Sequence, residues 1–151
     1  MLRIIVATFT SLDGVMQAPG GPQEDPTGGF TFGGWTAPHF DEAVGSAIGR
    51  IMARPFDLLL GRKTYDIFAA HWPHVTDPND AIAGIFNRVT KYVASRSPRK
   101  LAWQNSKLLG DDVVGSLREL KSEDGPDLLV QGRATSSGHS GSIGSSMNSM
   151  S

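Results

Sequence analysis

Short apolar segments typical of strands alternate with amphipathic segments typical of helices, and this alternation restricts the fold more than any other feature of the chain. The predicted strands are residues 2–9, 57–60, 91–95, 106–109 and 127–131, and the predicted helices are residues 39–53, 61–70, 80–89 and 111–121. This order is typical of an α/β fold in which helices cover both faces of a mostly parallel sheet. The 151 residues suffice for one domain with a buried core.

The first long predicted helix follows an extended loop, residues 15–35, which contains three Gly-Gly pairs and three prolines. Loops of this length inside a compact domain are usually functional or disordered. In the helix, apolar residues recur at the i, i+3, i+4 and i+7 positions of one face. We expect that face to be buried, and its members are Phe40, Ala43, Val44, Ala47, Ile48, Ile51 and Met52.

The composition excludes several classes of protein. Fourteen basic residues stand against fifteen acidic ones, so the chain is not a strongly basic nucleic-acid binder. It has no cysteine, which excludes disulfides, thiolate zinc sites and cysteine nucleophiles. It also has no apolar run of about 18 residues that could span a membrane, and we do not expect residues 1–9 to form a signal peptide. We expect a cytoplasmic domain with neither nucleic acid nor a membrane as its partner.

Three predicted strands end at a glycine or a hydroxyl residue, namely Gly61, Ser95 and Gly132. Ligands of parallel sheets bind beyond the carboxyl ends of the strands. At residues 61–64, Gly-Arg-Lys-Thr, the strand turns directly into a helix, and the free backbone N–H groups and dipole at a helix start favour a phosphate. The spacing fits an ordinary strand-to-helix turn with basic surface residues equally well. It does not match the Walker A pattern.

Two further segments carry groups suited to binding or catalysis. Ser95 and Arg96 follow a predicted strand and suit a second phosphate, although a solvated loop is the more common outcome. Asp41 begins a predicted helix, where an acidic residue usually compensates the helix dipole. The alternative for Asp41 is a proton relay that faces the site. His71 and His74 have poor spacing for metal ligands, and we expect no metal site.

Several segments, taken in order, carry a resemblance to a known family. They are residues 4–15, Gly34-Trp35, and residues 40–42, 60–65, 92–96 and 127–132. Over residues 1–132 the chain resembles the dihydrofolate-reductase-like family, in the branch of the RibD C-terminal reductase domain of riboflavin biosynthesis. The resemblance implies a three-layer fold and an NADPH-dependent reductase whose small-molecule substrate is similar to 5-amino-6-(5-phosphoribosylamino)uracil. The alternatives are a pterin reductase acting on dihydrofolate, and an inactive remnant or nucleotide-binding module.

The resemblance also implies roles for particular residues. Those expected to hold the cofactor phosphates are Gly61, Arg62, Lys63, Thr64 and, on the pyrophosphate side, Gly132. Those expected at the adenosine end, with its 2′-phosphate, are Ser95 and Arg96. Those expected around the nicotinamide are Ala7, Leu12, Asp13 and Gly14, with the loop after them closing over the substrate. Asp41 resembles the family's acidic catalytic residue, although it falls one position later.

The segment after Gly132 departs from the family. Residues 133–151 contain eight serines and three glycines among nineteen residues, which predicts a disordered tail in place of the family's last helix and closing strands. Codons for this tail can be chosen so that a reading frame two bases on encodes an amphipathic helix and the start of a strand, and our hypothesis is a frameshift near codon 132. We therefore expect an incomplete domain over residues 1–132, weak or absent NADPH binding, and a homodimer only in a full-length parent.

Overall fold

The structure is a computed structural model that describes residues 2–96 and 100–132. The predictions of a disordered tail, a frameshift and missing closing strands concern residues 133–151, which lie outside the described residues. The predicted strands and helices between residues 2 and 132 are all present, with ends that differ by a few residues from those expected.

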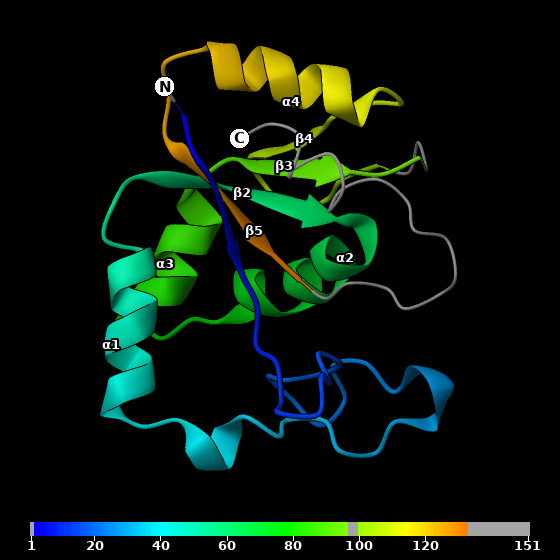
Figure 1. The fold of residues 1–151 in the computed structure, drawn as a ribbon, viewed down its shortest axis with the longest axis vertical. Helices are drawn as coiled ribbons and strands as arrows, with labels where there is room; N and C mark the ends of the chain where they lie inside the picture. The colour runs from blue at the N-terminus through cyan, green and yellow to red at the C-terminus, as the bar shows by residue number, and fades with distance from the viewer. Residues whose placement is uncertain (1, 97–99, 133–151) are drawn as a thin grey trace.

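Within the described residues, five parallel strands form the central layer (Figure 1). They are β1 (Ile4–Ala7), β2 (Phe56–Gly61), β3 (Lys91–Ala94), β4 (Ser106–Leu108) and β5 (Asp127–Gln131). Their order across the sheet is β1-β5-β2-β3-β4, and each neighbouring pair is parallel. The last strand along the chain therefore lies between the first and the second.

Helices cover both faces of the sheet, which confirms the predicted three-layer α/β fold. α2 (Arg62–His71) and α3 (Ala81–Arg88) lie on one face and α4 (Val113–Ser122) on the other, whereas α1 (Glu42–Ile51) lies at the side (Figure 1). Short 3-10 helices interrupt the loops at η1 (Thr27–Gly29), η2 (Ala37–His39) and η3 (Trp72–His74). Among the described residues no helix is long and apolar enough to cross a membrane.

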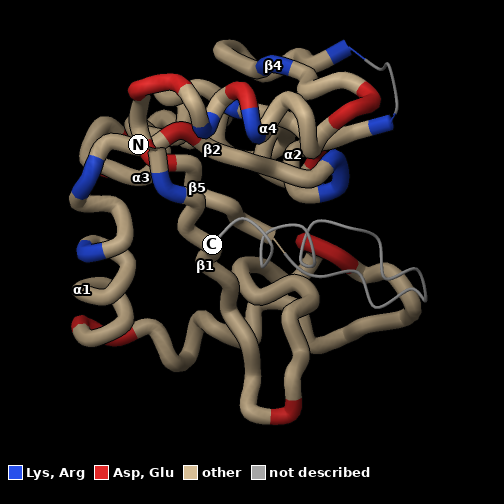
Figure 2. The backbone as a smooth tube through the Cα atoms, turned by 45° about the horizontal axis from the view of Figure 1, so that its top comes forward, with Lys and Arg blue, Asp and Glu red and all other residues tan. Residues whose placement is uncertain are grey.

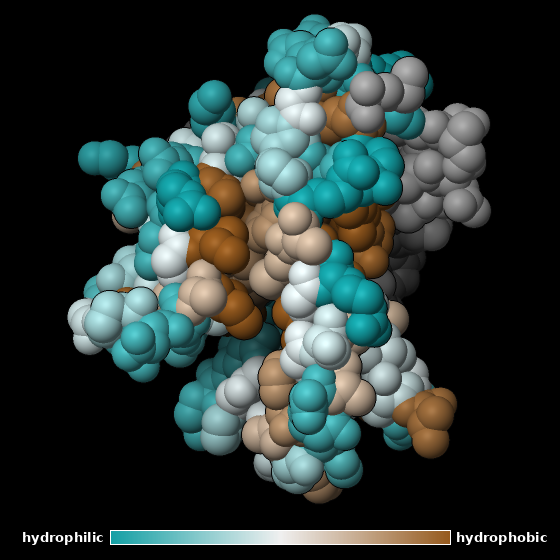
Figure 3. Space-filling view, turned by 90° about the vertical axis from the view of Figure 1, so that its left-hand side faces the viewer, coloured by the Kyte–Doolittle hydropathy of each residue, from teal (hydrophilic) through white to brown (hydrophobic). Residues whose placement is uncertain are grey.

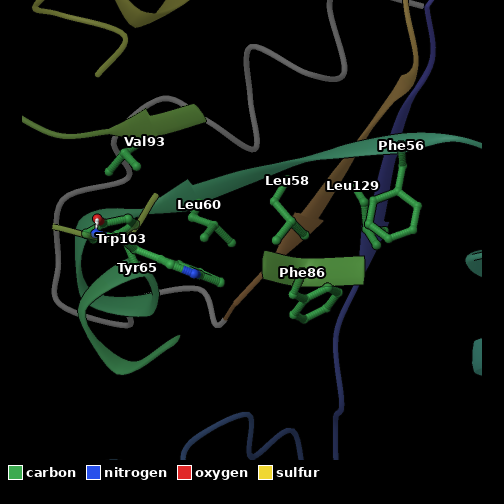
Figure 4. Close-up of a cluster of buried hydrophobic side chains, with 8 residues drawn as sticks. All are labelled: Phe56, Leu58, Leu60, Tyr65, Phe86, Val93, Trp103 and Leu129. Carbon is green, nitrogen blue, oxygen red and sulfur yellow. Dashed lines mark hydrogen bonds between the residues drawn. The ribbon is translucent and has the colours of Figure 1, made fainter. Parts of the chain in front are cut away.

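Each face of the sheet has its own cluster of buried side chains. The larger cluster lies against α2 and α3 and contains Phe56, Leu58, Leu60, Tyr65, Phe86, Val93, Trp103 and Leu129 (Figure 4). The smaller cluster lies against α4 and contains Leu2, Leu59, Leu117 and Leu128. Successive side chains of a strand point to opposite faces, so Leu58 and Leu60 join one cluster and Leu59 joins the other. Burial on both faces explains the apolar run over residues 58–60 of β2.

The predicted burial of the apolar face of the first long helix is wrong. No residue of α1 is buried. Val44 and Ile48 are partly buried, while Phe40 and Ile51 are 53% and 37% exposed. The reason is that α1 lies at the side of the sheet, and the residue that packs against the larger cluster is Met52, just after the helix. Figure 3, which faces this side of the molecule, shows apolar side chains open to solvent.

Candidate functional site

The register of the sheet brings the predicted strand ends to one edge. Ala7 of β1 pairs with Gln131 of β5, which also pairs with Leu60 of β2, while Gly61 pairs with Ala94 of β3. The carboxyl ends of four neighbouring strands therefore lie in one row. Gly132 and Ser95, the residues that follow β5 and β3, continue from this row. The structure thus brings together the three strand ends singled out from the sequence.

The start of α2 differs from the starts of the other α-helices. The N-cap side chains of α1, α3 and α4 are Asp41, Asp80 and Asp112, and each accepts a hydrogen bond from a first-turn backbone N–H. The N-cap of α2 is Gly61, which has no side chain with which to cap. Its first-turn N–H groups therefore begin the helix without such an acceptor, at the carboxyl edge of the sheet.

The end of β5 lies directly against the start of α2. Gly132 has a φ of +138°, a conformation that side-chain-bearing residues rarely adopt. A Cβ atom at Gly132 would lie 2.6 Å from Oγ1 of Thr64. Two of the residues expected at the cofactor phosphates are therefore in close approach, and only a glycine leaves the Thr64 hydroxyl uncovered there.

The two basic residues of this turn make ion pairs with acidic side chains. Nε of Arg62 donates to Oδ1 of Asp66, one turn further along α2, at 2.9 Å. Nζ of Lys63 donates to Oδ1 of Asp25 at 2.9 Å and to Oγ1 of Thr27 at 3.0 Å. Figure 2 shows this basic segment at the start of α2 next to the acidic segment of the long loop. The sequence analysis did not identify Asp25 or Thr27, because a contact between residues 38 positions apart leaves no local pattern.

The turn after β1 is held by its own hydrogen bonds. The hydroxyl of Ser11 donates to Oδ1 of Asp13 at 2.5 Å and accepts from the backbone N–H of Val15 at 2.8 Å. The first of these bonds lowers the pKa of Asp13. Leu12 is fully exposed, and Gly14 has a φ of +87°. The turn presents an apolar side chain to solvent.

Two predicted site residues remain, Asp41 and Arg96. Asp41 is exposed, and its Oδ1 accepts a hydrogen bond from the backbone N–H of Val44 at 2.9 Å, as a helix cap does. Arg96 is exposed after β3, and the residues that follow it, 97–99, lie outside the described part of the chain. No group of three or more His, Asp or Glu residues within 2–96 and 100–132 could hold a metal ion.

A surface depression lies at the opposite edge of the sheet. It is lined by Arg54, Pro55, Gly125, Pro126 and Asp127, near the amino end of β5. None of the predicted site residues lines it.

Comparison with known families decides the relationship. The family model of the RibD C-terminal domain matches residues 3–139, a span that includes the five strands and four α-helices of the described residues. The chain belongs to the RibD C-terminal domain family. No curated protein shows a significant match to the chain. RibD C-terminal domains are reductase domains of the riboflavin-biosynthesis type with a dihydrofolate-reductase-like fold, and the order and direction of the strands described above agree with that fold.

Proposed function

We propose that this RibD C-terminal domain is an NADPH-dependent reductase acting on a ribosylamino-pyrimidine such as 5-amino-6-(5-phosphoribosylamino)uracil. The observation that carries the proposal is the close approach of Gly132 to Thr64 at the start of α2. A helix start without a capping side chain, approached by a glycine and a hydroxyl, suits the pyrophosphate of a dinucleotide. The family is one in which NADPH is the usual cofactor.

The residues of this chain would bind and orient the cofactor. The first-turn N–H groups of α2 and the Thr64 hydroxyl would donate to the phosphates. Ser95 and Arg96 would bind the adenosine end, where a guanidinium suits the 2′-phosphate. Ala7 and the turn over residues 11–15 would line the nicotinamide site. When bound, NADPH supplies the hydride, and the protein supplies orientation and electrostatics.

The proposal is tested by titrating the purified chain with NADPH and following the cofactor fluorescence. We expect weak, saturable binding that is lost in Gly132→Ala. The new Cβ would clash with Thr64 in a backbone conformation that costs about 1–3 kcal/mol for a residue other than glycine. Gly125→Ala is the matched control, because a Cβ there meets nothing within 4 Å. If Gly132→Ala does not fold, Thr64→Ala removes the hydroxyl without the clash.

Turnover separates the alternatives. Oxidation of NADPH with the ribosylamino-pyrimidine and not with dihydrofolate supports the proposed reaction. Turnover of dihydrofolate, sensitive to an antifolate, would favour a pterin reductase. Binding without turnover of either substrate would make the chain a nucleotide-binding module. No binding by a chain that keeps a folded near-UV circular dichroism spectrum would contradict the proposal.

A further inference from the structure

The contact between Lys63 and the long loop places a buried carboxylate next to the expected phosphate site. Oδ1 of Asp25 accepts hydrogen bonds from Nζ of Lys63 at 2.9 Å and from the hydroxyl of Thr27 at 2.5 Å. The side chain of Asp25 is only 3% exposed, whereas that of Lys63 is 45% exposed. The loop therefore contributes the buried partner of this pair, and α2 contributes the partner that solvent and ligands can reach.

The loop itself is tied together by its own hydrogen bonds. Nε2 of Gln17 donates to the backbone oxygens of Asp25 and Thr27 at 2.9 and 2.7 Å. Nε1 of Trp35 donates to the backbone oxygen of Gln17 at 2.9 Å, and the N–H of Gly34 donates to the oxygen of Ala18 at 2.8 Å. Residues 17–35 are therefore linked by hydrogen bonds within the loop, and the contact through Lys63 joins this loop to α2.

We propose that the Lys63–Asp25 pair is a latch that phosphate binding opens. The inference rests on the proposed function, because it requires an anion at the start of α2. A phosphate there would accept hydrogen bonds both from Lys63, which now donates to Asp25, and from the first-turn N–H groups of α2. The phosphate and the Asp25 carboxylate would also repel each other. Cofactor binding thereby breaks the ion pair between Lys63 and Asp25. The loop next to the turn over residues 11–15 then loses its contact with α2 through Lys63.

The latch and a supporting role of Asp25 predict opposite effects of Asp25 substitution on anion affinity. If Asp25 only oriented Lys63 toward the phosphate, its loss would weaken anion binding. If Asp25 competes with the phosphate, Asp25→Asn binds the anion more tightly, by about fivefold, the equivalent of one partly exposed ion pair. The matched control is Glu24→Gln, which removes the same charge one position earlier and keeps an oxygen acceptor for the N–H groups of Gly20 and Gly21.

Hydrogen exchange measured by mass spectrometry over residues 15–35 tests the proposal, with inorganic pyrophosphate as the probe. In the wild-type chain and in Glu24→Gln, pyrophosphate should speed exchange in this loop. In Asp25→Asn the loop should exchange fast without ligand, and pyrophosphate should change nothing further. Lys63→Gln opens the latch from its exposed side and should behave the same way, so the test does not depend on one variant folding.

The outcomes separate the latch from the proposed function. Pyrophosphate bound to the wild-type chain with unchanged loop exchange, or bound more weakly by Asp25→Asn, would overturn the latch. Pyrophosphate that opens the loop in a chain that fails to bind NADPH would leave the latch standing and contradict the proposed function. Failure of Asp25→Asn and the wild-type chain to bind either ligand would overturn both.

Discussion

At the scale of single residues, the lysine that begins β3 is the most unusual side chain. Lys91 is fully buried, and its Nζ donates to the backbone oxygens of Phe86 and Asn87 at 2.9 and 3.2 Å. It also lies 4.3 Å from the centre of the Trp103 ring. These contacts place a cation at the end of α3, where the helix dipole favours one. Burial nevertheless lowers the pKa of Lys91 to about 8, and the charge of Asp57 opposes that shift.

We expect the stability of the protein to rise with pH above about 8 because of Lys91. The folded protein releases this proton near pH 8, whereas the unfolded chain holds it until about 10.5. The unfolded state therefore binds more protons in this window, and the free energy of unfolding increases with pH. The whole shift corresponds to about 3 kcal/mol. Urea denaturation at several pH values measures the rise.

Two lysine variants isolate this effect. Lys91→Met should flatten the rise in stability, while Lys100→Met, at an exposed lysine, should preserve it. A rise of the same size in Lys91→Met would contradict the assignment. The pH series should end near pH 10. Burial raises the pKa of Tyr92 in the folded protein, so above that pH its phenol ionises first in the unfolded chain and stabilises that state.

At the scale of elements, the helix starts separate a structural role of an acidic residue from a catalytic one. Asp41 caps α1 and is also the residue that resembles the family's catalytic acid. An asparagine caps a helix about as well as an aspartate, whereas an alanine does not. The two substitutions therefore change different properties of the same position.

We expect Asp41→Ala to lower the free energy of unfolding by about 1 kcal/mol and Asp41→Asn to leave it nearly unchanged. If Asp41 relays a proton, both variants lose turnover to a similar degree, because neither side chain can carry the proton. Urea denaturation and NADPH oxidation with the substrate that turns over measure the two properties. Full turnover in Asp41→Asn would limit Asp41 to its role as a cap.

The positions of the elements were predictable because each has a local cause. The apolar run over residues 58–60 and the glycine after it predict a buried strand that leads into a helix, and β2 and α2 follow that order. The burial of α1 was not predictable, because periodicity shows that a helix has an apolar face and not how completely that face is covered. Lys91 was missed for a similar reason, since a lysine at the start of a strand gives no sign of burial.

At the scale of the whole molecule, the pairing of β1 with β5 joins the first and the last described strands of the chain. Arg3 donates to both carboxylate oxygens of Asp127, with its backbone N–H at 3.0 Å from Oδ1 and its guanidinium at 2.7 Å from Oδ2. Arg54 lies 3.4 Å from the same Oδ2. The hydrogen bonds and charge of Arg3 lower the pKa of Asp127, and burial opposes this shift. Neither this contact nor the strand order could be predicted from local sequence, because both join residues far apart in the chain.

We expect Asp127→Asn to lower the free energy of unfolding at pH 7 by roughly 1–3 kcal/mol, the usual contribution of hydrogen bonds to a charged group. The depressed pKa means that this stabilisation is present above the ordinary aspartate pKa and is lost as the pH falls through the folded value. Urea denaturation at pH 7 and at a series of lower pH values should show a difference that shrinks as the pH falls. Asp111→Asn, at an exposed carboxylate, is the control. Equal stability of the wild-type and Asp127→Asn chains at pH 7 would contradict the prediction.

The placement of β1 beside β5 has a consequence for synthesis on the ribosome. Arg3 and Asp127 are 124 positions apart, so β1 leaves the ribosome on the order of 10 seconds before its partner strand is made. During that interval Ile4, Ile5 and Val6 have no neighbouring strand, and an unpaired apolar strand readily associates with other chains. Until residue 131 has emerged, the nascent chain therefore avoids aggregation only if its association with other chains is slow or if chaperones bind it. The first strand to be made is therefore among the last to pair with a neighbour in the sheet.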